Sequence, residues 1–80
     1  MAGWREALWA TYEADLFGAE AGDRLLNPYR DLDPAHDVPD APAIRRANLR
    51  AALDAIPERP EVLVVAEAPG PWGCRFSGIP

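Results

Sequence analysis

The sequence predicts an α/β fold, and three observations lead to it. Residues 4–18 and 42–56 carry apolar side chains at helical spacing, and residues 61–66 (EVLVVA) contain an unbroken apolar run. Such a run is typical of a strand buried on both faces of a parallel sheet. A loop rich in glycine and proline follows it, as at the end of a strand in an α/β unit. We therefore expect residues 1–80 to form one small domain with two helices and the first strand.

The first expected helix covers residues 4–18. Its large apolar side chains recur every four positions and so share one face: Trp4, Leu8, Tyr12 and Leu16. We expect the aromatic residues of this helix to be part of the core or of a surface for docking another domain: Trp4, Trp9 and Tyr12. A platform on which nucleic-acid bases stack is the alternative.

A loop and a second helix follow. Residues 27–42 (NPYRDLDPAHDVPDAP) contain four prolines, which exclude a helix or a central strand and predict a surface loop with His36 in solvent. Residues 42–56 form the helix, with Asp40 as its N-cap.

The second helix has an apolar face and an arginine-rich remainder. The apolar face follows the amphipathic pattern of positions i, i+3, i+4 and i+7: Leu49, Ala52, Leu53 and Ile56. The arginines lie off that face or at its edge, so we expect them in solvent, with DNA phosphates as the alternative partner: Arg45, Arg46 and Arg50.

Composition excludes several classes of site. The formal net charge is −5, which argues against indiscriminate binding of nucleic acid. With Cys74 as its one cysteine, the chain cannot form an internal disulfide or a cysteine-pair metal site, and we expect no metal and no cofactor. No secretion signal and no membrane-length apolar run occur, so we expect a cytoplasmic protein. The oligomeric state stays open.

Glu67 follows the predicted strand directly. Ligands of open α/β sheets bind beyond the carboxyl ends of the strands, where this carboxylate would lie. Ala68-Pro69-Gly70 then turns the chain sharply. The arrangement suits a carboxylate that positions or deprotonates a water molecule. A carboxylate that merely caps the following turn is the alternative.

The segment AEAPGPWGCRFSGIP, residues 66–80, resembles the first active-site motif of the uracil-DNA glycosylase superfamily. The resemblance is strongest to a bacterial branch with the motif GEAPG. Three more segments are similar in order and spacing: NPYR at 27–30, IRRANL at 44–49 and RPEVLVV at 59–65. The resemblance implies a three-layer α/β/α fold and hydrolysis of the N-glycosidic bond of uracil in DNA. The partner would be uracil-containing DNA, whose base leaves the stack to enter a pocket.

The resemblance also implies roles for single residues. Glu67 matches the acid that positions water, and Gly70 matches the glycine that lets the backbone approach the ligand. Ala66 replaces the first glycine of the motif, and Ala68 stands where other branches place Asp or Asn. Pro69 completes the substrate-binding turn. Support of the pocket is the role expected for the following loop: Cys74, Arg75, Gly78 and Pro80.

Some family features are missing from these 80 residues. The chain stops at Pro80, where the family continues with a phenylalanine that stacks under uracil, and it holds neither the uracil-reading asparagine nor the histidine-containing second motif. The two-cysteine pair of the iron–sulfur relatives is absent as well. We expect the N-terminal portion of a glycosylase-like domain, inactive by itself, and leave open whether the stop is natural. The alternatives are a non-catalytic module that binds nucleic acid or protein, and an enzyme acting on free nucleotides.

Overall fold

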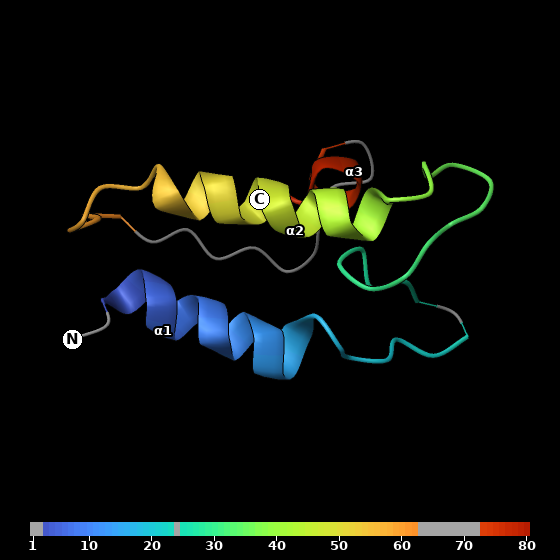
Figure 1. The fold of residues 1–80 in the computed structure, drawn as a ribbon, viewed down its shortest axis with the longest axis horizontal. Coiled ribbons are helices and arrows are strands. Elements are labelled where there is room, and N and C mark those ends of the chain that lie inside the picture. The colour runs from blue at the N-terminus through green and yellow to red at the C-terminus, as the bar shows by residue number, and fades with distance from the viewer. Residues whose placement is uncertain (1–2, 24, 63–72) are drawn as a thin grey trace.

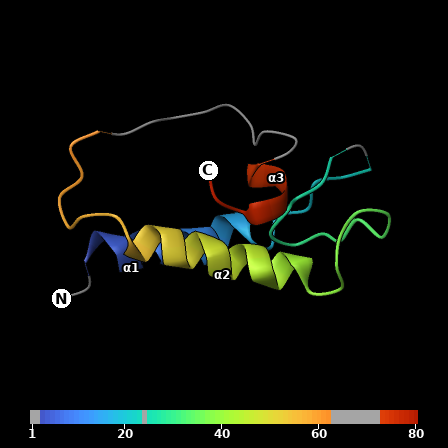
Figure 2. The same cartoon turned by 90° about the horizontal axis from the view of Figure 1, so that it is seen from above.

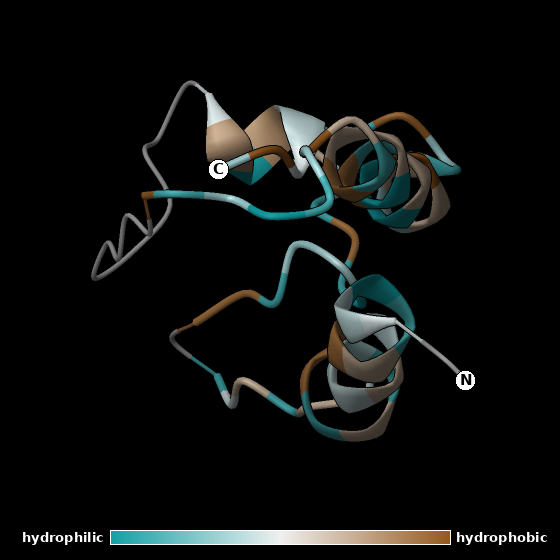
Figure 3. Ribbon diagram, turned by 90° about the vertical axis from the view of Figure 1, so that its left-hand side faces the viewer, coloured by the Kyte–Doolittle hydropathy of each residue, from teal (hydrophilic) through white to brown (hydrophobic). Residues whose placement is uncertain are grey.

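The computed structural model describes residues 3–23, 25–62 and 73–80. Its helices are, in chain order, α1 (Trp4–Thr11), η1 (Tyr12–Leu16), α2 (Ala41–Asp54) and α3 (Cys74–Ser77). Helices α1 and α2 lie side by side and run in opposite directions (Figure 1). The short helix α3 packs against α2 (Figure 2). In an end-on view α1 and α3 border different sides of α2 (Figure 3), so α2 is the central element of the described structure.

The first expected helix is confirmed as α1 and its continuation η1. The chain enters α1 from extended backbone at Gly3 and keeps α-helical hydrogen bonds as far as Thr11. From Tyr12 the helix widens into a π-helical turn, which the Phe17 N–H closes by donating to the Tyr12 carbonyl at 2.8 Å. This wider turn leads into the loop in which Phe17 packs edge-on against the ring of Trp9, with centroids 5.1 Å apart.

The second expected helix is confirmed as α2. It begins one residue before Pro42, where a missing backbone N–H costs nothing because the first turn has no helical acceptor for it. Asp40 occupies the N-cap position, but its side chain makes no capping hydrogen bond; its carbonyl accepts the Ile44 N–H at 3.0 Å. The helix ends at Asp54, three residues before Pro57.

Arg5 of α1 joins the beginning of α1 to the end of α2. Its guanidinium donates to the carbonyls of Leu53, at 3.3 Å, and Ile56, and pairs with Glu58 at 2.5 Å. The indole N–H of Trp4 donates to the Glu58 carbonyl at 2.7 Å. The last carbonyls of a helix lack partners within the helix and carry partial negative charge. A cation from α1 thus satisfies the C-terminus of α2, and this contact favours the antiparallel arrangement.

The core of the described residues is small. Its buried apolar members are few: Tyr29, Ala41, Leu49 and Leu53. Leu49 and Leu53 confirm the expected apolar face of α2, whereas Ile56 at the end of that face is 37% exposed. Among residues 3–23, 25–62 and 73–80, Arg45 is the most buried, at 1% exposure, which contradicts its expected place in solvent.

The predicted α/β fold is wrong. The described residues are helical and contain neither a strand nor a sheet, so the expected α/β/α layers are not formed there. Of the predicted strand at 61–66, Glu61 and Val62 lie in irregular backbone, and the other four positions fall outside the described residues. A strand must pair its N–H and C=O groups with a neighbouring strand. The sequence has one such apolar run and no second one to pair with it, whereas a helix of several turns pairs its interior N–H and C=O groups within itself.

Candidate functional site

The residues predicted to form the site divide into two groups. The motif itself lies outside the described residues: Ala66, Glu67, Ala68, Pro69 and Gly70. The residues expected to support the pocket lie in α3 or in the three residues after it: Cys74, Arg75, Gly78 and Pro80. What the structure describes is therefore the segment that follows the motif, residues 73–80, together with the side chains that hold it.

Helix α3 is a single turn that cannot be stable alone, because isolated short helices do not repay the cost of nucleation. It ends at Ser77, and the next residue, Gly78, has a left-handed backbone (φ 79°) and donates its N–H to the Cys74 carbonyl at 2.8 Å. This ending is common where glycine follows a helix, since other residues are strained at positive φ. Contacts from the rest of the chain must supply the remaining stability.

Gly78 also lies directly against the backbone of α2. A Cβ atom added to Gly78 would come within 2.6 Å of the Arg45 carbonyl oxygen and 2.8 Å of the Arg45 Cβ. Both distances are shorter than van der Waals contact. Glycine is thus required here by its backbone angle and by the space available.

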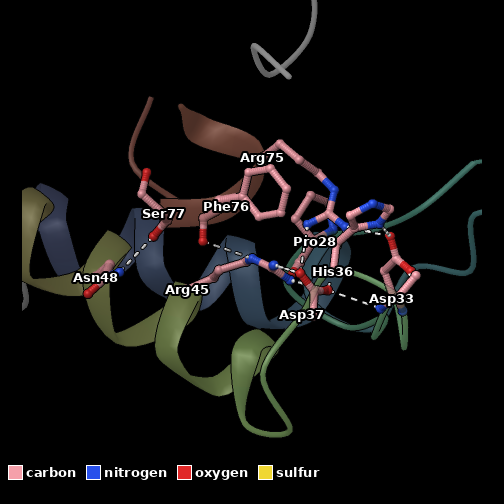
Figure 4. A network of polar contacts seen from close by, with 10 residues as sticks. Pro28, Asp33, His36, Asp37, Arg45, Asn48, Arg75, Phe76 and Ser77 are labelled. Atoms are coloured by element: carbon pink, nitrogen blue, oxygen red, sulfur yellow. Dashed lines mark hydrogen bonds and ion pairs between the residues drawn. The ribbon is translucent and has the colours of Figure 1, made fainter. Parts of the chain in front are cut away.

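Three side chains satisfy the last carbonyls of α3. Arg45 Nε donates to the Phe76 carbonyl at 3.1 Å and Asn48 Nδ2 donates to the Ser77 carbonyl at 2.8 Å (Figure 4). The Tyr29 hydroxyl donates to the Gly78 carbonyl at 2.7 Å. Carbonyls at the end of a helix have no internal donors. These bonds therefore fix α3 to α2 and to the loop before α2.

The central contact is an ion pair between Arg45 and Asp37. Arg45 Nη2 contacts Asp37 Oδ1, and Nη1 donates to Oδ2 at 3.2 Å and to the Pro28 carbonyl at 3.1 Å. The two side chains are 2% and 0% exposed. The hydrogen bonds from Arg45 are the main reason that the pKa of Asp37 lies well below its ordinary value, although burial acts in the opposite direction.

Arg75 of α3 approaches the same carboxylate from the other side. Its Nη1 and Nη2 lie 3.4 and 3.5 Å from the two oxygens of Asp37, and Nη2 lies 3.8 Å from Asp33 Oδ2. His36 Nδ1 contacts Asp33 Oδ2 at 2.8 Å (Figure 4). The hydrogen bond with His36, followed by one from the Ala35 N–H, lowers the pKa of Asp33. His36 itself is largely exposed, as expected.

Asn27 builds the turn at the start of the loop. Its buried side chain donates to the carbonyls of Leu16, at 2.8 Å, and Ala19, at 3.0 Å, and accepts the Tyr29 N–H at 3.1 Å. The Tyr29 carbonyl in turn accepts a hydrogen bond of 2.5 Å from Arg46 Nη1.

These contacts join three segments that are separated in the sequence: NPYR, IRRANL and residues 73–80. We call the joined residues the Arg45 cluster: Asn27, Pro28, Tyr29, Asp33, Asp37, Arg45, Asn48, Arg75, Phe76, Ser77 and Gly78.

Sequence reasoning did not single out the ion pair at the centre of this cluster. A signal for the burial of Arg45 exists, since it precedes Leu49 by four residues and Leu53 by eight and so lies on the same stripe of α2. No spacing rule identifies Asp37 among the aspartates of the loop. Its role depends on a fold that brings residues 37, 45 and 75 together.

Tyr29 and Cys74 lie close together at the edge of the cluster. Burial is the main cause that raises the pKa of the Tyr29 hydroxyl to about 12, and the neighbouring Cys74 thiol acts in the same direction.

Within the described residues no three side chains of the metal-binding types come together. No helix of the described part is long and apolar enough to cross a membrane.

Two hollows lie along the helices, away from the ion pair. The larger, of about 870 Å³, is an apolar groove bordered by α1, α2 and the segment after α2: Trp4, Leu8, Tyr12, Leu49, Ala52, Leu53, Ile56, Pro57, Arg59, Pro60, Glu61, Val62 and Pro80. The smaller, of about 530 Å³, is lined by Trp9, Glu13, Phe17, Arg46, Ala47 and Arg50. Neither includes Asp37 or Arg75.

Comparisons of the chain with protein-family models, with curated proteins and with solved structures found no match. The function of this chain is therefore inferred from the residues of the motif and from the geometry of the Arg45 cluster.

Proposed function

We propose that this chain takes part in hydrolysis of the N-glycosidic bond of uracil in DNA, as a relative of the uracil-DNA glycosylases. One observation supports the proposal most directly. The NPYR and IRRANL segments and the end of the motif segment, which each resemble that superfamily, meet in the Arg45 cluster. A likeness in three separate segments gains weight when their side chains depend on one another for burial and hydrogen bonding.

The proposed chemistry assigns the reacting step to Glu67. Cleavage of the glycosidic bond leaves positive charge on the sugar, and a water molecule must attack there while the departing base is stabilised. A carboxylate that holds or deprotonates this water is suited to that role. Helix α3 begins four residues after Gly70. The Arg45 cluster therefore holds the segment that follows the motif residues 66–70.

The 80 residues supply only part of such a site. They contain neither the family's phenylalanine that stacks under uracil nor its second, histidine-containing motif. We therefore expect no uracil release by the 80-residue chain alone. Measurable release from uracil-containing single- or double-stranded oligonucleotides by the purified chain would overturn this expectation.

The test of the proposed function uses a chimeric chain that joins residues 1–80 to the later motifs of a superfamily member. Uracil release is measured for the chimera and for its Glu67→Gln variant, which keeps the size of the side chain and removes its charge. We expect a loss of at least about hundredfold, as for the removal of a general base. Glu61→Gln makes the same change six residues earlier, at an exposed position, and is the matched control.

Two alternatives give different results. An enzyme acting on free nucleotides would bind them in competition with uracil-containing DNA, so a nucleotide that displaces the DNA would favour it. A non-catalytic module would use its aromatic helix, and the apolar groove beside Trp4, Leu8 and Tyr12 is the observation that favours binding of a protein. Unchanged uracil release by the Glu67→Gln chimera would remove the catalytic role of Glu67.

A further inference from the structure

Asp37 has two arginine neighbours that are bound very differently. Arg45 is covered from solvent and uses its Nε, Nη1 and Nη2 atoms in hydrogen bonds with Phe76, Pro28 and Asp37. Arg75 is 19% exposed, and its contacts with Asp37 are 3.4 and 3.5 Å long. Charge-assisted hydrogen bonds between arginine and carboxylate are normally about 2.8 Å long. Arg45 thus satisfies Asp37, and Arg75 is a second, weakly bound cation.

The guanidinium of Arg75 is oriented by a neighbouring aromatic ring, while its donors make only long contacts with Asp33 and Asp37. It lies over the ring of Phe76, 4.9 Å from the ring centroid, in a cation–π arrangement. Stacking on an aromatic ring orients the plane of an arginine and leaves its N–H groups at the rim free for a planar or tetrahedral anion. Arg75 also contacts Asp33, whose Oδ2 lies 3.8 Å from Arg75 Nη2. Arg75 is therefore oriented, and its N–H groups are used only in long contacts.

If the Arg75 side chain moved away, the carboxylates of Asp33 and Asp37 would both keep other hydrogen-bond partners. Asp37 would keep both contacts with Arg45 and the N–H of Asp33, which donates to it at 3.0 Å. Asp33 would keep its contact with His36 at 2.8 Å and the Ala35 N–H at 3.0 Å. Asp33 and His36 are partly or largely exposed, so this side of the cluster is open to solvent.

We propose that Arg75 is a phosphate-binding arginine, whose guanidinium exchanges its long contacts with Asp33 and Asp37 for a phosphate group. The source of that phosphate, a DNA backbone rather than a free nucleotide, follows from the proposed function and rests on it. Arginine suits this role because its N–H groups match two phosphate oxygens at once. Asp33 competes with the phosphate for Arg75, and Asp33 keeps its contact with His36 Nδ1 at 2.8 Å when the exchange takes place.

The test uses the full 80-residue chain and a labelled single-stranded oligodeoxynucleotide without uracil, with binding measured by fluorescence anisotropy at several salt concentrations. Arg75→Gln is expected to weaken binding about tenfold, as for loss of a hydrogen-bonded charge, and to reduce the salt slope by about one. Arg59→Gln removes the same charge from an exposed position and is the matched control. Equal losses in the two variants would overturn the proposal.

A second variant tests the competition by Asp33. Asp33→Asn keeps an acceptor for the turn and removes the charge, and it is expected to strengthen binding about threefold, the size of an exposed ion pair. The double variant Asp33→Asn/Arg75→Gln should show no such gain. A gain that persists in the double variant would contradict exchange at Arg75. Circular dichroism of each variant shows whether the helices are intact, and the Arg75 Nε–Hε signal in NMR spectra reports binding in the unmodified chain directly.

Further probes distinguish the source of the phosphate and separate this inference from the proposed function. Titration with inorganic phosphate and with deoxyuridine monophosphate, followed at the same NMR signal, is expected to give weaker binding than the oligonucleotide. Tighter binding of the mononucleotide would overturn the DNA backbone as the source. Since the oligonucleotide lacks uracil, phosphate binding at Arg75 without uracil release by the chimera contradicts only the glycosylase proposal. Uracil release without a shift of the Arg75 signal contradicts only the present inference.

Discussion

The carboxylate of Asp37 and the guanidinium of Arg45 form an ion pair in which the two side chains are 0% and 2% exposed. This pair connects the loop before α2 with α2 itself, and Arg45 extends the connection to α3 through the Phe76 carbonyl. Because few apolar residues of the described part are buried, polar contacts of this kind determine where α3 lies.

Breaking the buried pair is expected to destabilise the chain strongly. Asp37→Asn or Arg45→Gln leaves one buried charge without its partner, and such changes cost about 3 kcal/mol or more of the free energy of unfolding. Chemical denaturation followed by tryptophan fluorescence measures the loss. Glu6→Gln breaks the solvent-exposed pair with Arg50 and is the control, for which a much smaller loss is expected.

The losses in the free energy of unfolding caused by Asp37→Asn and Arg45→Gln are expected to be non-additive. Once Asp37 has lost its charge, the further change Arg45→Gln removes an arginine that already lacks its partner. The double variant should therefore lose clearly less stability than the sum of the single losses. Additive losses in the double-mutant cycle would show that the two side chains do not act as a pair.

Gly78 and Gly22 provide a matched comparison, because both have positive φ angles, of 79° and 78°. The methyl group of alanine at Gly22 would meet no atom of the described residues within 4 Å, so Gly22→Ala should cost only the backbone strain, about 1 kcal/mol. Alanine at Gly78 would also collide with the Arg45 backbone, and Gly78→Ala is expected to cost about 3 kcal/mol, strain and overpacking together. Thermal unfolding of the two variants measures the difference, and equal losses would contradict the close approach of α3 to α2.

Stability is expected to fall in acid because of Asp37. Its pKa in the folded state is held below the ordinary value near 3.8, mainly by the hydrogen bonds from Arg45. The unfolded chain therefore takes up protons first as the pH drops. The contribution of Asp37 is present in full above about pH 5 and is lost progressively below about pH 4. Urea denaturation between pH 2 and 7 measures this loss, which should be shallower in Asp37→Asn; an unchanged profile would contradict the assignment.

Tyr29 is expected to limit stability in alkali. Its hydroxyl donates to the Gly78 carbonyl, and burial raises its pKa from 10.0 to about 12. The unfolded chain ionises first, so stability is complete below about pH 10 and falls as the pH rises from 10 towards 12. Tyr29→Phe should cost about 1 kcal/mol at neutral pH and flatten this alkaline decline.

Tyr12→Phe is the control for Tyr29→Phe. The rings of Tyr12 and Tyr29 both lie near the ring of Phe17, with centroid distances of 6.0 and 5.4 Å. Within the described residues, the Tyr12 hydroxyl donates no hydrogen bond. We expect an alkaline decline like that of the unmodified chain. If both variants flatten the decline equally, the effect does not arise from the bond with Gly78.

The two long helices and the loop between them could be predicted from the sequence, because their signals are local. The four-residue spacing of apolar side chains predicts α1 and η1, and Pro42 with the stripe of Leu49 and Leu53 predicts α2. The prolines between residues 27 and 42 predict the absence of helix there. The likeness to a glycosylase motif also comes from the sequence alone, and it stays a proposal.

Only the tertiary structure decided the absence of a sheet, the burial of Arg45 and the presence of α3, because these features depend on residues far apart in the chain. A strand at 61–66 needs neighbouring strands, which no local pattern within the 80 residues supplies. The burial of Arg45 and the presence of α3 follow from contacts among residues 28, 37, 45 and 76. Local spacing predicts the two long helices, but the free energy of a buried charge depends on which partner the fold brings to it.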